Sequence, residues 1–172
     1  TVQKALAMSG LRAFHQFYGA KPVGALVYEG LIRHGDPFRH LRRADALTQM
    51  DICRPDRSWN FWPNLDFAVL SAIRARYPGC VMVLNRRDPA ATASSMARWH
   101  DLQARITDSD IPGLPRGYGG TLAELEAWVS AHHAAVMAQF GGHPGFLDLD
   151  VTAPDAPARL GAALGIEIAW WG

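Results

Sequence analysis

The chain has 172 residues, of which 49% are apolar and 19% charged, with a formal net charge of +1. This length fits one domain with a sizeable core, so we expect a single domain over residues 1–172. The near-neutral charge gives no reason to expect nucleic acid or a membrane surface as a partner, and the apolar runs are too short for a transmembrane segment. Two cysteines, Cys53 and Cys80, make neither a disulfide nor a metal framework, which fits a cytoplasmic protein.

Hydrophobic periodicity predicts helices and strands that alternate along the chain. Helices are predicted where apolar residues recur at helical spacing between start and stop signals, at residues 2–10, 21–35, 64–79, 89–106, 121–140 and 156–165. Strands are predicted where short apolar or alternating runs occur, at residues 11–17, 44–51, 80–85 and 145–150. The segment 108–120, rich in glycine and proline, is either a lid over a site or a plain connection.

Strands that alternate with helices predict an α/β fold, with a parallel sheet covered by helices on both faces. In such sheets ligands bind beyond the carboxyl ends of the strands. We therefore expect one edge to gather the polar residues that end or follow a strand, namely Asp51, Arg86, Arg87, Asp150 and Thr152.

The stretch VMVLNRRDPAATASS, residues 81–95, carries the most specific chemical signal. Arg87 leaves a buried strand just before a helix amino terminus, which offers free N–H groups and a positive dipole. Its guanidinium has several N–H donors in one plane, a geometry that matches phosphate oxygens. Ser95 lies roughly 9 Å along the helix from Pro89. Arg87 and Ser95 are thus candidates to grip one phosphate, unless Arg87 pairs with an acidic neighbour such as Asp88.

The segment RARYPGCVMVLNRRDPAATASS resembles the second cofactor-binding motif of sulfotransferases that use 3'-phosphoadenosine 5'-phosphosulfate. The match consists of Tyr-Pro, a spacer, an apolar strand, Arg-Asp-Pro, and a serine eight residues after the arginine. The segment FLDLDVTAPDAPARLGAALG also resembles the late strand-turn-helix of bacterial members. The resemblance implies a fold like that of P-loop NTPases, with Arg87 and Ser95 bound to the 3'-phosphate, and sulfuryl transfer to a hydroxyl or amine without a metal.

One part of the family pattern is missing from the sequence. The family's first motif, of the type Gly-x-x-Lys-[Thr/Ser]-Gly-Thr-Thr, holds the 5'-phosphosulfate, and it does not occur here. TVQKALAMSG instead resembles the helix that follows this loop, so Thr1 would be at or just after the end of the loop and would belong to the cofactor site. We expect the chain to be a truncated sulfotransferase core whose upstream loop lies in a longer natural protein.

Sulfuryl transfer needs a base near the acceptor. Asp51 follows a strand at the predicted ligand edge and is the first candidate, with a turn-capping role as the alternative. His15, in a short strand, is the second, although such a histidine is more often structural. His100, a turn beyond Ser95, is a third. His132 and His133 project in different directions from one helix and are not expected to bind a metal.

Further residues have open roles. Arg86 either assists Arg87 or faces the opposite side of the strand end. The basic segment FRHLRR, residues 38–43, either touches an anionic acceptor or is a solvated helix face. Trp59, Phe61 and Trp62 either wall an aromatic acceptor pocket or pack the next helix onto the core.

Two other classes of function remain open from the sequence. A phosphate-loop kinase would use Asp51 to organise Mg²⁺ and Arg87 to hold the transferred phosphate. A non-catalytic relative of the sulfotransferase fold would bind nucleotide poorly, or bind only a partner protein. For the sulfotransferase, the sequence indicates a small-molecule or glycan acceptor and leaves its identity and the oligomeric state open.

Overall fold

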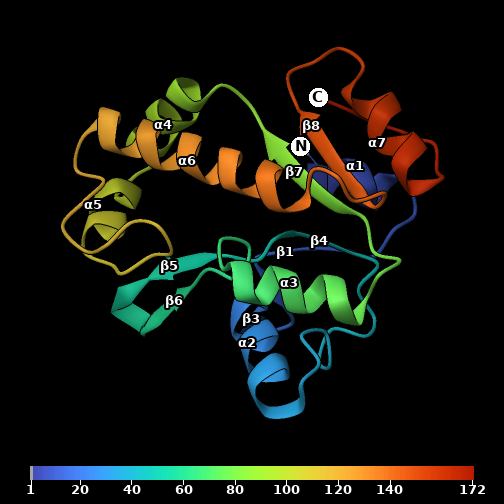
Figure 1. Cartoon of the computed structure of the whole chain (residues 1–172), viewed down its shortest axis with the longest axis horizontal. Coiled ribbons are helices and arrows are strands. Elements are labelled where there is room, and N and C mark those ends of the chain that lie inside the picture. Colours follow the sequence, from blue (N-terminus) through green and yellow to red (C-terminus); the bar gives the residue numbers. More distant parts are fainter. Residues whose placement is uncertain (1) are drawn as a thin grey trace. The chain divides into compact units, whose positions relative to one another are not determined.

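The computed structural model describes residues 2–172, which form a mixed α/β fold (Figure 1). The chain divides into two compact units. Unit 1 contains the chain up to Ile52 together with Phe61–Cys80 and Pro157–Gly172. Unit 2 contains Cys53–Asn60 and Val81–Ala156. The single domain expected from the length of the chain stays a prediction, and each unit is described here by itself.

Helices make up most of the regular structure in residues 2–172. The α-helices are α1 (Val2–Met8), α2 (Val23–His34), α3 (Phe67–Arg76), α4 (Pro89–Arg98), α5 (Leu102–Thr107), α6 (Leu122–Phe140) and α7 (Ala156–Leu164). The strands are β1 (Ala13–His15), β2 (Phe17–Tyr18), β3 (Lys21–Pro22), β4 (Ala46–Gln49), β5 (Ile52–Arg54), β6 (Trp59–Phe61), β7 (Met82–Arg86) and β8 (Phe146–Asp150).

The strands pair two by two, as β1–β4, β2–β3, β5–β6 and β7–β8. The first and last pairs are parallel, and β2–β3 is antiparallel. The predicted α/β class is therefore confirmed in its coarse form, as a mixed α/β fold with small parallel and antiparallel sheets. In place of the one continuous parallel sheet that we expected, the described residues form these four small ladders, because the strands are only two to five residues long.

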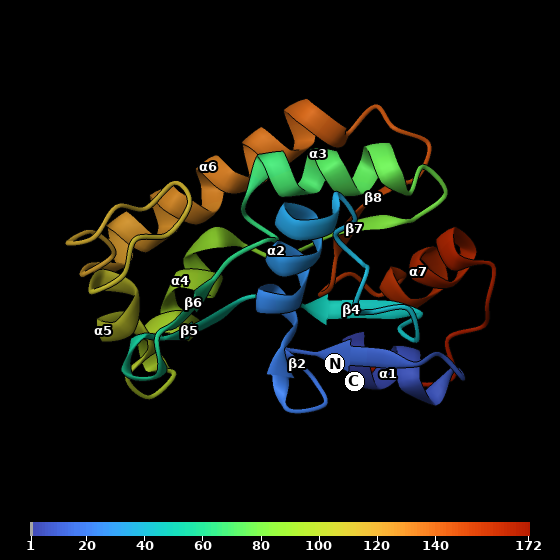
Figure 2. The same ribbon diagram turned by 90° about the horizontal axis from the view of Figure 1, so that it is seen from below.

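The core of unit 1 lies between α2 and α3. Figure 2 shows β1 and β4 side by side, with α1 next to β1. Apolar side chains of the two helices and of one connecting segment form the buried cluster Val23, Leu26, Val27, Leu41, Val69 and Ile73. This cluster fixes the helices against each other and so positions the loop after β4, which carries Asp51.

A close backbone approach holds the start of α2 near that loop. A Cβ atom at Gly24 would lie 2.5 Å from the Met50 carbonyl oxygen and 2.8 Å from Phe61 Cβ. Only glycine leaves room for this contact without a shift of the backbone. The residue before Asp51 is thus packed directly on α2.

Unit 2 is built on the parallel pair β7–β8, which is in register from Met82 opposite Phe146 to Arg86 opposite Asp150. Figure 1 shows α4 and α6 beside each other, as their contacts require. Apolar residues of these four elements are buried: Leu84, Ala93, Leu125, Val129, Val136 and Leu149. Strand β7, whose central residue Leu84 is buried, therefore ends in Arg86, and Arg87 follows it at the start of α4.

Local capping explains where several helices begin. The Asp88 carboxylate accepts a hydrogen bond from Ala91 N, and Pro89 occupies the first turn of α4. Thr121 and Glu124 form a capping box at the start of α6, where the sequence predicts a helix from residue 121. The predicted starts of α4 and α6 are thus confirmed.

The predicted helix over residues 89–106 is wrong in one respect, because it is broken into α4 and α5. His100 lies between them with a φ of 45°, a left-handed conformation that helices do not contain. The break turns α5 so that Ile106 is buried, with 1% of its surface exposed. The burial of Ile106 depends on packing against residues that are distant in the sequence. Helical periodicity contains no information about such contacts.

The sequence patterns missed the hairpin of β5 and β6, whose turn is the short helical segment Pro55–Arg57 followed by Ser58 in a left-handed conformation. Residues 38–43 form turns rather than the helix considered for them.

In the part of the chain from residue 2 onward, no helix has the length and apolarity that crossing a membrane would require.

Candidate functional site

The candidate site residues fall into two groups, one in each unit. His15 and Asp51 belong to unit 1, and Arg87 and Ser95 belong to unit 2. Thr1 lies outside the described residues. The geometry of each group is therefore given separately.

The Arg87 side chain folds back over the first turn of α4. Its Nε donates a hydrogen bond of 3.3 Å to Thr92 Oγ1, and its Nη2 donates one of 3.1 Å to the Ala91 carbonyl. Asp88, the alternative partner considered for Arg87, instead caps α4 through Ala91 N at 2.8 Å. The guanidinium is thus held by the helix and not by a carboxylate.

Ser95 is one turn further along the same helix face. It follows Thr92 by three residues and Ala91 by four, and residues at these spacings are neighbours on a helix surface. In residues 2–172 no hydrogen bond joins Arg87 to Ser95. A guanidinium has five N–H donors, and the two bonds above leave the remainder for a ligand that lies over this turn.

The neighbouring Arg86 is engaged across the β7–β8 ladder. Its Nε and Nη2 donate to the two carboxylate oxygens of Asp148, at 2.5 and 2.9 Å. A bidentate pair of this kind holds the guanidinium plane in place. Asp150 accepts hydrogen bonds from the amide and hydroxyl of Thr152, at 2.9 and 2.6 Å. Arg86 with Asp148, and Thr152 with Asp150, thus form two hydrogen-bonded pairs.

Two side-chain amides hold the Asp51 carboxylate. Gln49 Nε2 donates to Asp51 Oδ2, and Asn64 Nδ2 donates to Asp51 Oδ1, each at 3.1 Å. Burial raises the pKa of Asp51 above its usual value, while these hydrogen bonds and the charge of His15 act in the opposite direction. Asp51 is therefore a fixed, partly buried carboxyl group with an increased affinity for a proton.

His15 ends β1 and is exposed, opposite Gln49 in the ladder with β4. Its Nδ1 lies 3.3 Å from Thr48 Oγ1. Gln49, the residue opposite His15, also donates to the Asp51 carboxylate, so both candidate bases are neighbours of Gln49. His15 and Asp51 thus lie at or just beyond the carboxyl end of the parallel pair β1–β4, whereas Arg86, Arg87, Asp150 and Thr152, which we expected at the same edge as Asp51, belong to unit 2.

The segment 108–120 is tied down in unit 2. Ile111 and Leu114 are each 5% exposed and pair with each other through their backbones. Trp128 Nε1 donates to the Pro112 carbonyl at 3.1 Å, and Gln103 Nε2 donates to the Gly119 carbonyl at 3.1 Å. This segment is an anchored loop and not a loose connection.

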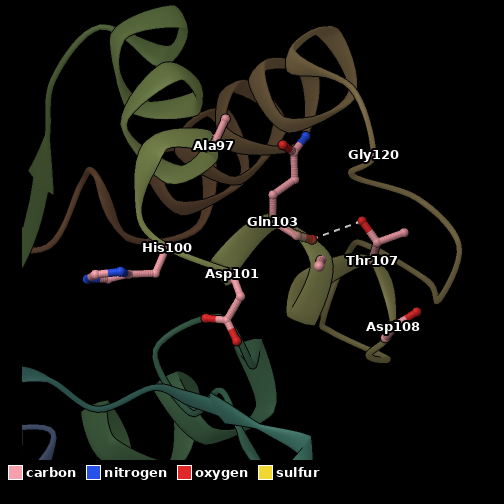
Figure 3. A pocket seen from close by; sticks show the side chains of 8 residues that line it. Ala97, His100, Asp101, Gln103, Thr107, Asp108 and Gly120 are labelled. Atoms are coloured by element: carbon pink, nitrogen blue, oxygen red, sulfur yellow. Dashed lines mark hydrogen bonds between the residues drawn. The ribbon is translucent and has the colours of Figure 1, made fainter.

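A hollow of about 470 Å³ lies beside the break between α4 and α5 (Figure 3). His100, Asp101, Gln103, Thr107 and Asp108 contribute to its lining. Figure 3 shows that the side chains of His100 and Asp101 point away from that of Gln103, while Thr107 Oγ1 donates to the Gln103 carbonyl at 3.0 Å. The polar groups do not converge on one point, so a chemical centre at His100 has no support from this geometry.

Other candidates take structural positions. His132 and His133 have ring centroids 6.4 Å apart on α6, and burial lowers the pKa of His132 to about 4. Trp62 is 7% exposed, and the ring of Phe61 lies 6.4 Å from that of Tyr28, which fits the packing role for these aromatic residues. Among residues 2–172, no three His, Cys, Asp or Glu side chains gather in a way that could hold a metal ion.

Three residues near the candidate bases were not identified from the sequence, namely Thr48, Gln49 and Asn64. Thr48 and Gln49 could have been noticed because they share the predicted strand that leads to Asp51. Asn64 gives no such signal, since it is 13 residues from Asp51 and reaches it only through the fold.

Comparisons of the chain with protein-family models, with curated proteins and with solved structures find no match.

Proposed function

We propose that this protein is a sulfotransferase that moves a sulfuryl group from 3'-phosphoadenosine 5'-phosphosulfate to an acceptor hydroxyl or amine. The observation that carries the proposal is the Arg87 guanidinium, which leaves β7 and lies over the first turn of α4, one turn before Ser95. This arrangement suits the 3'-phosphate of the nucleotide, because free donors of Arg87 and the amino end of α4 attract the same anion.

The chemistry also needs a group that takes the acceptor's proton. His15 and Asp51 supply two such groups, both neighbours of Gln49, and Asp51 has a raised pKa. In the proposed reaction the acceptor oxygen or nitrogen forms a bond to sulfur. The bond from sulfur to the bridging oxygen breaks, and adenosine 3',5'-bisphosphate leaves with the electron pair.

A binding experiment tests the anion site. Adenosine 3',5'-bisphosphate is titrated calorimetrically, without metal, into the longest natural protein that contains this sequence and into this chain alone. Arg87→Ala should weaken binding to the natural protein by about 1.5–3 kcal/mol, the range for a hydrogen bond to a charged group. Ser95→Ala should weaken it by less, because a hydroxyl carries no charge.

Arg98→Ala is the matched control, since it removes the same charge from the other end of α4, where Arg98 bonds to Ser94. It should leave the affinity unchanged. Equal affinities of the wild type and Arg87→Ala would exclude Arg87 from the site. If neither protein binds the nucleotide, the sulfotransferase proposal fails, and a kinase-like enzyme or a non-catalytic relative becomes the better interpretation.

A further inference from the structure

A bulge in the β1–β4 ladder controls the surroundings of His15. Phe14 is opposite Leu47, but His15 is opposite Gln49, so Thr48 is the extra residue on β4. Bulges of this kind redirect a side chain at the end of a ladder. Here the bulge brings the Thr48 hydroxyl to both the Phe14 carbonyl and the His15 ring.

The two contacts of the Thr48 hydroxyl favour one assignment of donor and acceptor. Thr48 Oγ1 bonds to the Phe14 carbonyl at 3.2 Å, and a carbonyl oxygen can only accept. The single hydroxyl hydrogen of Thr48 is therefore used. With that hydrogen on the Phe14 carbonyl, the contact of 3.3 Å between Thr48 Oγ1 and His15 Nδ1 is a hydrogen bond only when Nδ1 donates. In neutral His15 the proton is then on Nδ1, and Nε2 carries a free lone pair.

We propose that Thr48 is a positioning residue that keeps the proton of neutral His15 on Nδ1 and so makes Nε2 the atom that accepts a proton from the acceptor substrate. The catalytic part of this inference rests on the proposed sulfotransferase function. The tautomer itself is a property of the chain that holds with or without that reaction. His15 is exposed, so Nε2 can be reached by a hydroxyl or amine ligand.

The backbone next to His15 keeps this strand end in place. Gln16 has a φ of 63°, a left-handed conformation that is uncommon for residues other than glycine. Its N–H donates to the Gln49 carbonyl at 2.8 Å, and its own carbonyl accepts from Val23 N at 2.8 Å. The end of β1 is thus bonded both to β4 and to the start of α2, which limits the movement of the imidazole.

Asp51 follows β4, and the charge of His15 is one of the causes that lower the pKa of Asp51, against the larger effect of burial. In the proposed step Nε2 takes the proton of the acceptor while the acceptor atom bonds to sulfur and the bisphosphate leaves. The ring becomes an imidazolium ion that still donates from Nδ1 to Thr48. The Asp51 carboxylate, held by Gln49 and Asn64, stabilises this positive charge. The base and its orienting groups then have separate roles, as in other histidine-based proton transfers.

Nitrogen NMR of the His15 ring tests the tautomer directly. In the neutral ring of the wild-type chain, Nδ1 should show the signal of a protonated nitrogen and Nε2 that of an unprotonated one. Thr48→Val replaces the hydroxyl by a methyl group of similar shape, and the ring should then shift towards the Nε2–H form. Thr48→Ser keeps the hydroxyl and should keep the Nδ1–H form.

Turnover in the longest natural protein gives the second readout. Thr48→Val should lower kcat about tenfold or more while the affinity for adenosine 3',5'-bisphosphate stays the same, and Thr48→Ser should recover most of the loss. A wild-type ring that is protonated on Nε2 would overturn the positioning role, even if the Thr48→Val variant does not fold. Absence of sulfuryl transfer by the wild type would overturn the proposed function and the catalytic role of His15, while an Nδ1–H signal would still support the tautomer.

Discussion

The Asp51 carboxylate accepts a hydrogen bond of 3.1 Å from the Asn64 amide, and these two residues come from opposite ends of the β5–β6 hairpin segment. Gln49 holds the second carboxylate oxygen at the same distance. The carboxyl group is therefore fixed in orientation, and burial raises its pKa. A fixed carboxyl group beside an exposed histidine is suited to stabilising a proton on that histidine.

Asp51→Asn should lower the turnover of the sulfotransferase about 10- to 100-fold, at the low end of the contribution of proton-transfer groups, because the amide carries no charge to stabilise the His15 imidazolium ion. The affinity for adenosine 3',5'-bisphosphate should not change. Steady-state kinetics and calorimetry on the same preparations measure both quantities. Turnover equal to that of the wild type would exclude Asp51 from the reaction.

Asp51 should also affect the pH dependence of stability. Its pKa in the folded protein is raised above the ordinary value of 3.8, so the folded state binds the proton more tightly than the unfolded state. The stability that this tighter proton binding contributes to the folded state is fully present below pH 3.8, and it is lost as the pH rises through the folded pKa. The free energy of unfolding of the wild type should therefore fall relative to that of Asp51→Asn over this range. Urea unfolding of the two proteins at several pH values measures the difference, and a constant difference would contradict the raised pKa.

Tyr77→Phe should destabilise unit 1 by about 1–2 kcal/mol near neutral pH, because Tyr77 Oη donates to the buried Asp36 carboxylate. This hydrogen bond is the main cause of the lowered pKa of Asp36. The stabilisation by a lowered carboxyl pKa is present above its unfolded value and is lost as the pH falls through the folded pKa. The difference between wild type and variant should therefore shrink on acidification below about 3.8.

Thermal unfolding over a series of pH values measures this effect. Tyr118→Phe is the matched control, because Tyr118 is 56% exposed and its loss of a hydroxyl should have little effect. A Tyr77→Phe variant whose deficit is the same at every pH would show that the tyrosine stabilises the fold through packing alone.

Gly24→Ala should destabilise the chain by about 1–3 kcal/mol, as an overpacked position does. The new Cβ would meet the Met50 carbonyl at 2.5 Å, and neither the helix nor the loop can move without disturbing the other. Alanine would otherwise favour the helix, so a loss of stability reports the clash. Gly79→Ala is the control, because no atom lies within 4 Å of its added Cβ. Chemical denaturation compares the two, and equal stabilities would show that the loop before Asp51 gives way freely.

Helices with local start signals were predicted well from the sequence. The capping box of Thr121 and Glu124 and the Asp88-Pro89 start of α4 act within a single turn, so neighbouring residues contain the whole signal. The same reasoning failed at His100, where a left-handed residue breaks the helix. The burial of Ile106 that follows this break depends on distant residues, which a periodic pattern cannot include.

The candidate site likewise contains some features that local sequence predicted and others that depend on distant residues. The sequence by itself determined that Arg87 follows a strand at the start of a helix and that Ser95 comes two turns later, because both residues belong to one continuous segment. It also indicated Asp51 and His15 as polar residues at strand ends. Only the tertiary structure decided that Thr48 sits in a bulge against His15, 33 residues away. Hydrogen bonds between distant segments form only when strand register and helix packing bring their atoms within about 3 Å, and no local pattern encodes that distance.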